Sequence, residues 1–235
     1  YKHCPKLFYY KYVLEMPAFE NDYAAEQSSK GDLPGNIIGL IVHDVMQNMH
    51  VRGFDEALSF ACEKYLQMHE RQQAQESIRP WLNSYITGEL YSKIRDKKHF
   101  DEYAFTMPLM DNDGMNYVFT GSIDCLVFEG DGSVSIIDFK TDKNIEGKMD
   151  DYGVQLAVYA LVVKKLFPDK DLLSNSLHFI RHNKELKVEA RESTDDEVLS
   201  LCKEISSKHE DAAFSYDTNW CKFCSFGYFC SYYKK

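Results

Sequence analysis

The sequence has no long hydrophobic run. The longest apolar stretches, around residues 37–42 and 156–163, are far shorter than the roughly 18 residues that a membrane-spanning helix needs. The N-terminal residues also lack a charged segment followed by an apolar one, so nothing in them indicates a secretion signal. We therefore expect a cytoplasmic protein without a membrane partner.

Internal repeats and low-complexity segments are absent as well. Hydrophobic residues make up 44% and charged residues 27% of the chain, which is typical of a soluble globular protein. A length of 235 residues is enough for one large domain with a sizeable core. Because the sequence begins with Tyr1 and not Met, we expect it to be a segment of a longer protein or a trimmed chain.

Positive charge is scarce. The chain has 27 Lys and Arg residues against 37 Asp and Glu residues, a net charge of −10. This argues mildly against a nucleic-acid partner, because phosphate contacts need basic side chains. Grouped basic residues could still bind DNA, and metal-binding carboxylates would account for part of the negative charge. The candidate groups are Lys2, Lys6 and Lys11, then Lys164 and Lys165, then Arg181, His182 and Lys184, although scattered solvated side chains explain each group equally well.

The first part of the chain has the apolar spacing of helices. Residues 1–15 predict a short helix rich in aromatic residues, and residues 26–35 a loop with Gly, Ser and Pro. A helical stripe of apolar residues begins at Asn36. Two further helical patterns follow near residues 54–70 and 76–95.

Alternating strand patterns replace the helical ones from Phe100. Three strands joined by two short Asp- and Gly-rich turns predict an antiparallel meander. An amphipathic helix, a strand pair and a last helix complete the pattern. The expected ranges are 100–110, 115–129 and 133–140 for the strands, 152–167 for the helix, 176–190 for the strand pair and 194–210 for the last helix. The fold class is therefore α/β, with a central mixed sheet and flanking helices.

Two of the expected strands carry a group of acidic and basic residues. Asp138 and Lys140 are two apart in one strand, so their side chains lie on the same face, and Asp124 lies on the neighbouring strand. Two carboxylates in a partly buried site repel each other, and a divalent cation relieves that repulsion. Oxygen ligands suit Mg²⁺ or Mn²⁺, and the backbone carbonyl of Phe139 could add another. Lys140 would hold an attacking water or stabilise charge on a phosphate.

An Asp-x-Lys triplet alone is usually surface charge. Here it follows Ile136 and Ile137 in a strand that should be buried, and a buried acid needs a partner or a ligand. His43, in an expected apolar helix, is either a core histidine or a third metal ligand. Gln155 and Tyr159 lie four apart on one helical face, as ordinary surface residues or as a pair that contacts a phosphate or orients Lys140.

Together these residues resemble a known family. A helix with Gly-x-x-x-His, then Gly-x-x-Asp, Asp-x-Lys and Gln-x-x-x-Tyr, in this order, resembles the RecB-like branch of the PD-(D/E)xK nuclease superfamily. The resemblance implies a restriction-endonuclease-like core that cleaves DNA phosphodiester bonds with a divalent metal. It implies His43, Asp124 and Asp138 as metal ligands and Lys140 as the catalytic lysine. Glu102 fits a further family acid, although an exposed Glu at a strand edge is the simpler interpretation.

The cysteine spacing predicts a second site. Cys221, Cys224 and Cys230 form a Cys-x₂-Cys-x₅-Cys group among aromatic residues, with no His at finger-like spacing. Three such thiolates need a fourth to complete a soft-metal site, and Cys4 is the remaining candidate. The other three, Cys62, Cys125 and Cys202, look like buried structural cysteines in a helix, a strand and a helix.

One cysteine before the nuclease core and three after it resemble the iron–sulfur site of AddB-type nucleases, which related CRISPR-associated nucleases share. The resemblance implies a [4Fe–4S] cluster, with a structural Zn²⁺ as the alternative. Either metal would tie the two chain ends together. We expect a single nuclease domain over 1–235, with a helical region 1–98, a catalytic α/β core 99–212 and an iron–sulfur segment 213–235.

The function expected is a metal-dependent deoxyribonuclease, an exonuclease on single-stranded DNA or DNA ends in recombination or repair. The partners would be DNA and a helicase, either as a domain or as a separate subunit. The alternatives are a catalytically weak module of the same fold that binds DNA or a partner, and a redox sensor centred on the cluster.

Overall fold

In the computed structural model of the chain, residues 4–16, 33–146, 148–188, 194–208, 213–227 and 229–233 are described. They belong to two compact units. The core unit is Gly35–Ser200, and the end unit joins Tyr1–Pro34 to Leu201–Lys235. No helix within the described ranges is long and apolar enough to cross a membrane.

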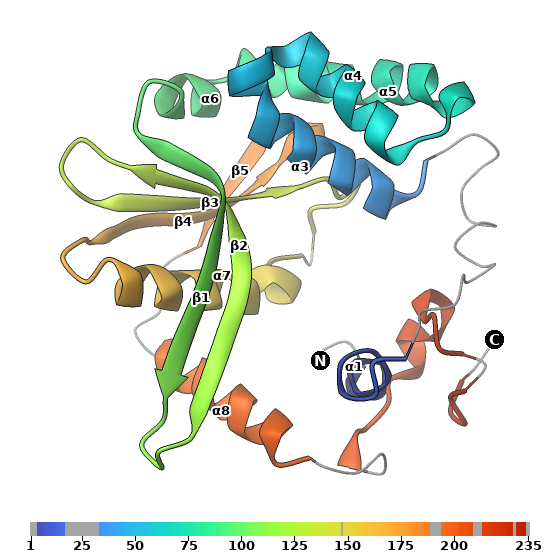
Figure 1. Cartoon of the computed structure of the whole chain (residues 1–235), viewed down its shortest axis with the longest axis vertical. Helices are drawn as coiled ribbons and strands as arrows, with labels where there is room; N and C mark the ends of the chain where they lie inside the picture. Colours follow the sequence, from blue (N-terminus) through green and yellow to red (C-terminus); the bar gives the residue numbers. More distant parts are fainter. Residues whose placement is uncertain are drawn as a thin grey trace. The chain divides into compact units, whose positions relative to one another are not determined.

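The core unit contains a five-stranded mixed sheet with strand order β1-β2-β3-β4-β5 (Figure 1). Only the β3–β4 pair is parallel, and the other neighbours are antiparallel. The first three strands form the predicted meander, so the expected mixed sheet is confirmed. The strands are β1 (His99–Met110), β2 (Asn116–Phe128), β3 (Val134–Lys140), β4 (Leu172–Phe179) and β5 (Lys184–Val188).

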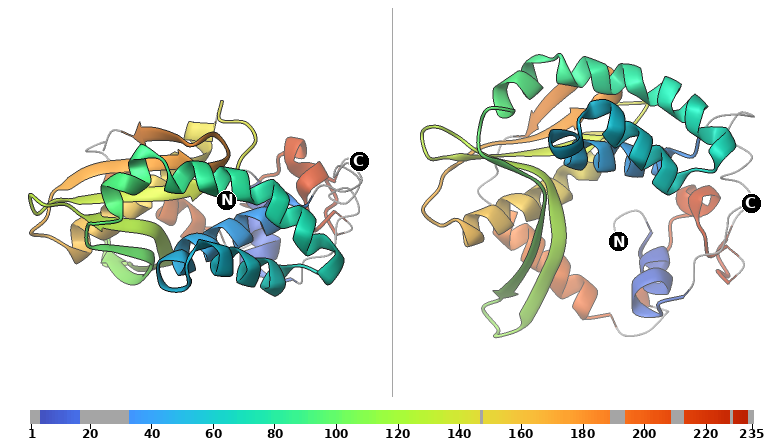
Figure 2. Two further views of the ribbon diagram at one scale, coloured as in Figure 1. Left: turned by 90° about the horizontal axis from the view of Figure 1, so that it is seen from above. Right: turned by 45° about the horizontal axis from the view of Figure 1, so that its top comes forward.

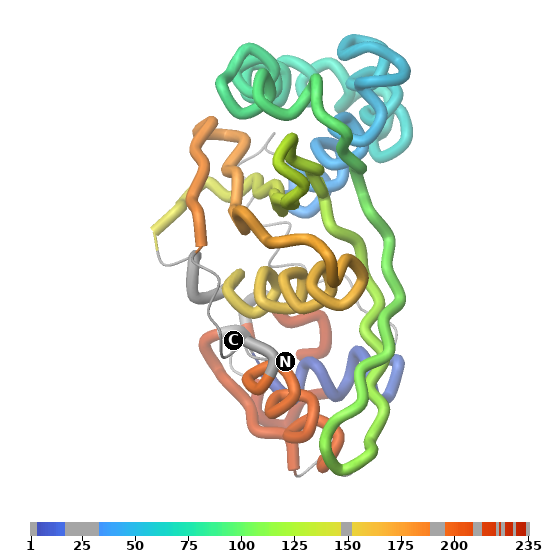
Figure 3. Tube along the Cα trace, turned by 90° about the vertical axis from the view of Figure 1, so that its left-hand side faces the viewer, coloured from blue at the N-terminus to red at the C-terminus, as the bar shows by residue number. Residues whose placement is uncertain are grey.

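Two tight turns determine how the meander is connected. Gly114 and Gly132 have φ values of 81° and 90°, a left-handed conformation that favours glycine. In the first turn, Asp111 Oδ1 accepts hydrogen bonds from the backbone N–H groups of Asp113 and Met115, both at 2.9 Å. As a result β1 and β2 pair along nearly their whole length and form a long two-stranded ribbon (Figure 3).

Helices cover both faces of the sheet. Four lie on one side and α7 (Lys148–Leu166) lies on the other, as Figures 1 and 2 show. The four are α3 (Gly35–Arg52), α4 (Phe54–Tyr65), α5 (Met68–Ile86) and α6 (Glu89–Ile94). Because both faces are covered, the middle strand β3 is buried at every position except Lys140.

The helix boundaries correct one prediction. The patterns near 54–70 and 76–95 are three helices, not two. The carboxylate of Glu70 accepts a hydrogen bond from the backbone N–H of Gln67 at 3.0 Å, which starts α5 eight residues before the expected second helix. Gly88 then separates α5 from α6.

The end unit brings the two ends of the chain together. The N–H of Lys6, in α1 (Pro5–Phe8), donates to the carbonyl of Ser215 at 2.9 Å. Rings from η1 (Tyr9–Val13) contact rings of the C-terminal segment, with centroids 4.8 Å apart for Tyr9 and Phe214. Lys6 is only 1% exposed, so its place in a surface basic group was wrong, while Lys2 lies outside the described residues.

Candidate active site

Three elements of the core unit bring acidic and imidazole groups together. His43 comes from α3, Glu102 from β1 and Asp124 from β2. His43 Nδ1 lies 3.2 Å from Glu102 Oε1 and 3.6 Å from Asp124 Oδ1. One ligand atom from each of the three residues lies within 4.8 Å of the other two, which is close enough for one cation to contact all of them. His43 is thus a partly exposed site residue and not a core histidine.

The second part of the site is a chain of polar contacts that starts at a fully buried acid. Asp138 is 0% exposed, and its Oδ2 lies 2.6 Å from Lys140 Nζ. Lys140 Nζ also donates to Gln155 Oε1 at 3.0 Å, and Gln155 Nε2 donates to the Tyr159 hydroxyl at 2.8 Å. The residues predicted from the sequence therefore meet, and Gln155 contacts Lys140 directly.

A backbone hydrogen bond links the two parts. The N–H of Phe139 donates to Asp124 Oδ2 at 2.7 Å, so the middle residue of the Asp-x-Lys segment fixes the carboxylate on the neighbouring strand. No described group hydrogen-bonds to Asp138 Oδ1, although the atom is buried. A buried carboxylate oxygen without a partner is costly unless a cation contacts it.

Burial shapes the electrostatics of the site. It raises the pKa of Asp124 to about 7, assisted by the negative charge of Asp138. Burial also raises the pKa of Asp138, against the opposing effect of Lys140. For His43 burial lowers the pKa, but the hydrogen bond to Glu102 and the charge of Asp124 outweigh it and the pKa is raised overall. The metal-free site thus favours bound protons, which a cation would displace.

Glu102 is more involved than the sequence suggested. The simpler interpretation made it an exposed strand-edge residue, but it is 27% exposed and hydrogen-bonded to His43. That hydrogen bond lowers the pKa of Glu102, so the carboxylate stays charged. Its φ of 51° inside β1 breaks the regular alternation of strand side chains. Periodicity alone could not have revealed this.

Gly121, from the predicted Gly-x-x-Asp segment, has a packing role. It pairs with Phe105 across β1 and β2, and a Cβ atom at Gly121 would lie 2.8 Å from the Phe105 ring. The Phe105 ring in turn meets the Tyr159 ring edge to face at 6.1 Å. The absence of a side chain at Gly121 therefore lets an aromatic pair form beside the polar chain.

Two residues that the sequence did not single out also contact this region. The Tyr152 ring lies under the Lys140 ammonium, 4.3 Å from ring centroid to Nζ, and the Tyr152 hydroxyl donates to Asp142 Oδ2 at 2.7 Å. A cation above an aromatic face is attracted to it. Only their distance from the motif in the sequence hid them.

The predicted basic groups differ in character. The Arg181 guanidinium stacks 3.9 Å above the Trp81 ring and donates to the carbonyl of Thr141 at 2.6 Å, so it is at least partly structural. Lys164 and Lys165 are exposed at the end of α7. His182 and Lys184 are exposed in and beside η2 (Ile180–His182), the turn between β4 and β5.

The four candidate cluster cysteines line a single pocket in the end unit. Cys4, Cys221, Cys224 and Cys230 share it with the buried Lys6 and with aromatic residues. Cys224 Sγ accepts a hydrogen bond from the N–H of Phe226 at 3.4 Å. Burial raises the pKa of Cys224, and the three other cysteines raise it further. Cys62 and Cys125 are buried as expected, whereas Cys202 is only half-buried, which corrects that prediction.

Buried carboxylates beside an Asp-x-Lys strand, in a mixed sheet covered by helices, define a nuclease-like fold and site. The model of the PD-(D/E)XK nuclease superfamily matches residues 1–231, and the chain belongs to this superfamily. The mixed five-stranded sheet with flanking helices agrees with the fold of that family.

Two curated relatives are large subunits of ATP-dependent helicase/nucleases. The chain is 32% identical over 155 residues to the one from Bacillus cereus and 28% identical over 158 residues to the one from Lysinibacillus sphaericus. The matches cover 54% and 59% of this chain but only 12% of each relative. The solved structure titled "Crystal structure of SSO0001" aligns with a TM-score of 0.46 and 16% identity, over 83% of this chain and 86% of that one.

Proposed function

We propose that the chain is a divalent-metal-dependent DNA nuclease whose active site is formed by His43, Asp124, Asp138 and Lys140. One observation carries the proposal most strongly. The buried Asp138 holds the Lys140 ammonium at 2.6 Å while its Oδ1 has no hydrogen-bond partner among the described residues. A salt bridge of this kind, next to a second buried acid, suits phosphate chemistry better than structural stability.

The donor set fits a hard or borderline divalent cation such as Mg²⁺ or Mn²⁺. Its members would be His43, Asp124, Asp138 and the carbonyl of Phe139, with Glu102 as an additional acid. Carboxylate and carbonyl oxygens favour Mg²⁺, and the imidazole adds some preference for Mn²⁺. When bound, the cation would neutralise the carboxylates and polarise the phosphate.

The protein's own residues then supply position and charge. Hydrolysis adds the oxygen of a water molecule to phosphorus, and the departing sugar oxygen takes up a proton. Lys140, held between Asp138, Gln155 and the Tyr152 ring, would orient that water or stabilise negative charge on the phosphate. Gln155 and Tyr159 act as positioning residues through Lys140.

Metal removal tests this function. The purified chain is incubated with labelled single-stranded DNA after EDTA treatment, with and without added Mn²⁺ or Mg²⁺. We expect no cleavage without metal, recovery on metal addition, and no recovery in Asp138→Asn. A control variant, Asp169→Asn, changes an exposed acid outside the site and should recover fully. Cleavage that persists in Asp138→Asn would refute the assignment.

We also propose that the four cysteines of the end unit bind a [4Fe–4S] cluster. Among the described residues, no three of these sulfurs lie within 4.8 Å of one another. A tetrahedral Zn²⁺ with bonds of about 2.3 Å would hold all four sulfurs about 3.8 Å apart. A cubane cluster spaces its ligands more widely, because each thiolate binds a different iron. The buried Lys6 would favour the net negative charge of either cofactor.

Iron and acid-labile sulfide contents of anaerobically purified protein separate the two metals. We expect a brown sample with about four irons per chain. A colourless sample with one zinc per chain would contradict the cluster and leave the four-cysteine site intact. The nuclease proposal stands or fails independently of this result.

For the substrate we propose single-stranded DNA or DNA ends, with a helicase domain or a separate helicase chain for a partner. The relatives' names support this, since both are helicase–nuclease proteins. Linear and circular single-stranded DNA distinguish the modes of cleavage. An exonuclease degrades only the linear form, and degradation of the circle would show endonuclease action. No degradation of either form with added metal would favour a binding module of the same fold.

A further inference from the structure

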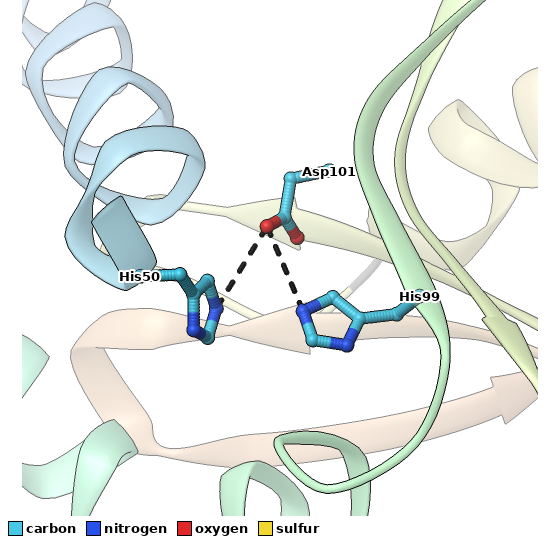
Figure 4. A group of neighbouring side chains, drawn as sticks. All are labelled: His50, His99 and Asp101. Atoms are coloured by element: carbon cyan, nitrogen blue, oxygen red, sulfur yellow. Dashed lines mark ion pairs between the residues drawn. The ribbon is translucent and has the colours of Figure 1, made fainter.

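A second group of potential metal ligands lies in the core unit, away from the candidate active site. His50 is on the last turn of α3, and His99 and Asp101 are on β1 (Figure 4). Two residues apart in a strand, His99 and Asp101 lie on the same face of β1. His50 is seven residues after His43, which places it about 10 Å further along the helix axis.

The three side chains point toward one another. His50 Nε2 lies 3.7 Å and His99 Nε2 3.8 Å from the same atom, Asp101 Oδ2, as Figure 4 shows. These distances are too long for hydrogen bonds. Around a tetrahedral ion with bonds of about 2.0 to 2.1 Å, neighbouring donor atoms are about 3.4 Å apart. Small side-chain rotations would therefore bring all three donors to a single ion.

One hydrogen bond defines which nitrogen of His99 is available. Its Nδ1 lies 2.9 Å from the carbonyl oxygen of Lys97, and since a carbonyl only accepts, Nδ1 carries the proton. In the neutral ring, Nε2 then points its lone pair toward the Asp101 carboxylate. Metal-binding histidines commonly have this arrangement, in which the remote ring N–H donates to a backbone carbonyl. Without a cation or a proton between them, the lone pair and the carboxylate would repel each other.

The surrounding groups hold the donors in place. The His50 ring stacks on Tyr91 of α6, with centroids 5.8 Å apart, and meets the His99 ring edge-on at 5.0 Å. The thiol of Cys125, the residue paired with Asp101 across β1 and β2, hydrogen-bonds to the Asp101 carboxylate. Cys125 is fully buried, and burial raises its thiol pKa well above the usual range, so it stays a neutral donor.

The backbone conformation of Glu102 makes this second group compatible with the first. Asp101 and Glu102 are adjacent on β1, yet each contacts a histidine of α3, His50 and His43 respectively. Adjacent side chains of a regular strand point to opposite faces, and the positive φ of Glu102 interrupts that pattern. Such strain persists where the surroundings enforce it, often at functional sites.

From this geometry we propose that His50, His99 and Asp101 form a second metal site, which binds Zn²⁺ or a similar transition-metal ion and fastens the end of α3 to β1. Two imidazoles and one carboxylate with an open fourth position suit Zn²⁺ better than Mg²⁺. The side chains are 27%, 13% and 18% exposed, so an ion can reach them. The bound ion would hold α3 in the place from which His43 reaches Glu102 and Asp124.

Zinc stoichiometry tests the proposal on the full chain, with its four-cysteine site already occupied. Protein is treated with EDTA, given one equivalent of Zn²⁺, passed through a desalting column and analysed for zinc and iron. We expect wild type to retain one zinc more than His50→Gln, His99→Ala and Asp101→Asn, each with at least about tenfold weaker binding. Two variants are controls and should retain that zinc, His69→Ala, which changes an exposed histidine on α5, and His43→Ala, which removes the active-site imidazole.

Thermal unfolding provides a readout that does not depend on ion counting. Zinc that binds only the folded protein raises its melting temperature, so the rise should be present in wild type and His69→Ala and absent in Asp101→Asn. Circular dichroism verifies that each variant is folded, and the three ligand variants need not all fold for a comparison. Equal zinc retention in wild type and a folded ligand variant, or loss of the zinc only in His43→Ala, would overturn the proposal.

Discussion

Replacement of Asp124 by Asn should stabilise the metal-free protein at neutral pH while it abolishes metal binding. Asp124 is 9% exposed, and burial with the nearby Asp138 charge raises its pKa from 3.8 to about 7. The folded state therefore holds a proton that the unfolded state releases. Stability from this group is fully present below pH 4 and is lost as the pH rises through 7. A shift of about three units corresponds to about 4 kcal/mol at most.

Asn keeps the shape of Asp and can still accept the hydrogen bond from the N–H of Phe139. It cannot become charged, so the metal-free variant should lose little stability between pH 5 and 8. For a chain of this size, 1 kcal/mol shifts the melting temperature by about 2 to 4 °C, so we expect a gain of up to about 10 °C at pH 7.5. Mn²⁺ should then stabilise wild type and not the variant.

The assay is thermal unfolding in EDTA and in excess Mn²⁺ at pH 5, 6, 7 and 8. Asp169→Asn is the matched control, because it removes an exposed acid on the surface. The reasoning is refuted if metal-free Asp124→Asn is less stable than wild type at pH 7.5. It is equally refuted if the stability of wild type is flat from pH 5 to 8 in EDTA.

Three further changes test other parts of the structure. Gln155→Ala should lower kcat about tenfold with little change in KM, because Lys140 keeps its contact with Asp138 but loses one hydrogen bond, and unchanged kcat would remove Gln155 from the site. Gly121→Ala should destabilise the protein by about 1 to 3 kcal/mol in denaturant unfolding, because its Cβ would lie 2.8 Å from Phe105, whereas Gly130→Ala has open space and should be neutral. Cys224→Ser should give insoluble or poorly folded protein, since the cofactor closes nearly the whole chain into a loop, and a soluble, colourless and fully active variant would contradict this.

The alternation of apolar residues and the turn glycines made the meander predictable. The same alternation placed Asp138 beside Lys140 and opposite the strand of Asp124, so the central part of the site followed from spacing alone. Long-range contacts followed less well. The helix break at Gln67 depends on a side-chain cap, and the burial of Lys6 depends on contact between chain ends more than 200 residues apart.

Glu102 and Asp101 show the limit of sequence patterns most clearly. Periodicity assigns one of them to each face of β1, yet both contact α3 because Glu102 adopts a positive φ. That conformation results from tertiary packing and leaves no trace in the apolar pattern. For the same reason the cluster of His50, His99 and Asp101 was not foreseen.

The most direct test of the central claim is the single-turnover rate of DNA cleavage by Lys140→Ala in saturating Mn²⁺. Lys187→Ala, on the exposed side of β5, is the matched control for loss of one positive charge. We predict that the Lys140 variant is about 10²- to 10³-fold slower than wild type and that the Lys187 variant is nearly unchanged. Equal rates for wild type and Lys140→Ala would contradict the proposed active site.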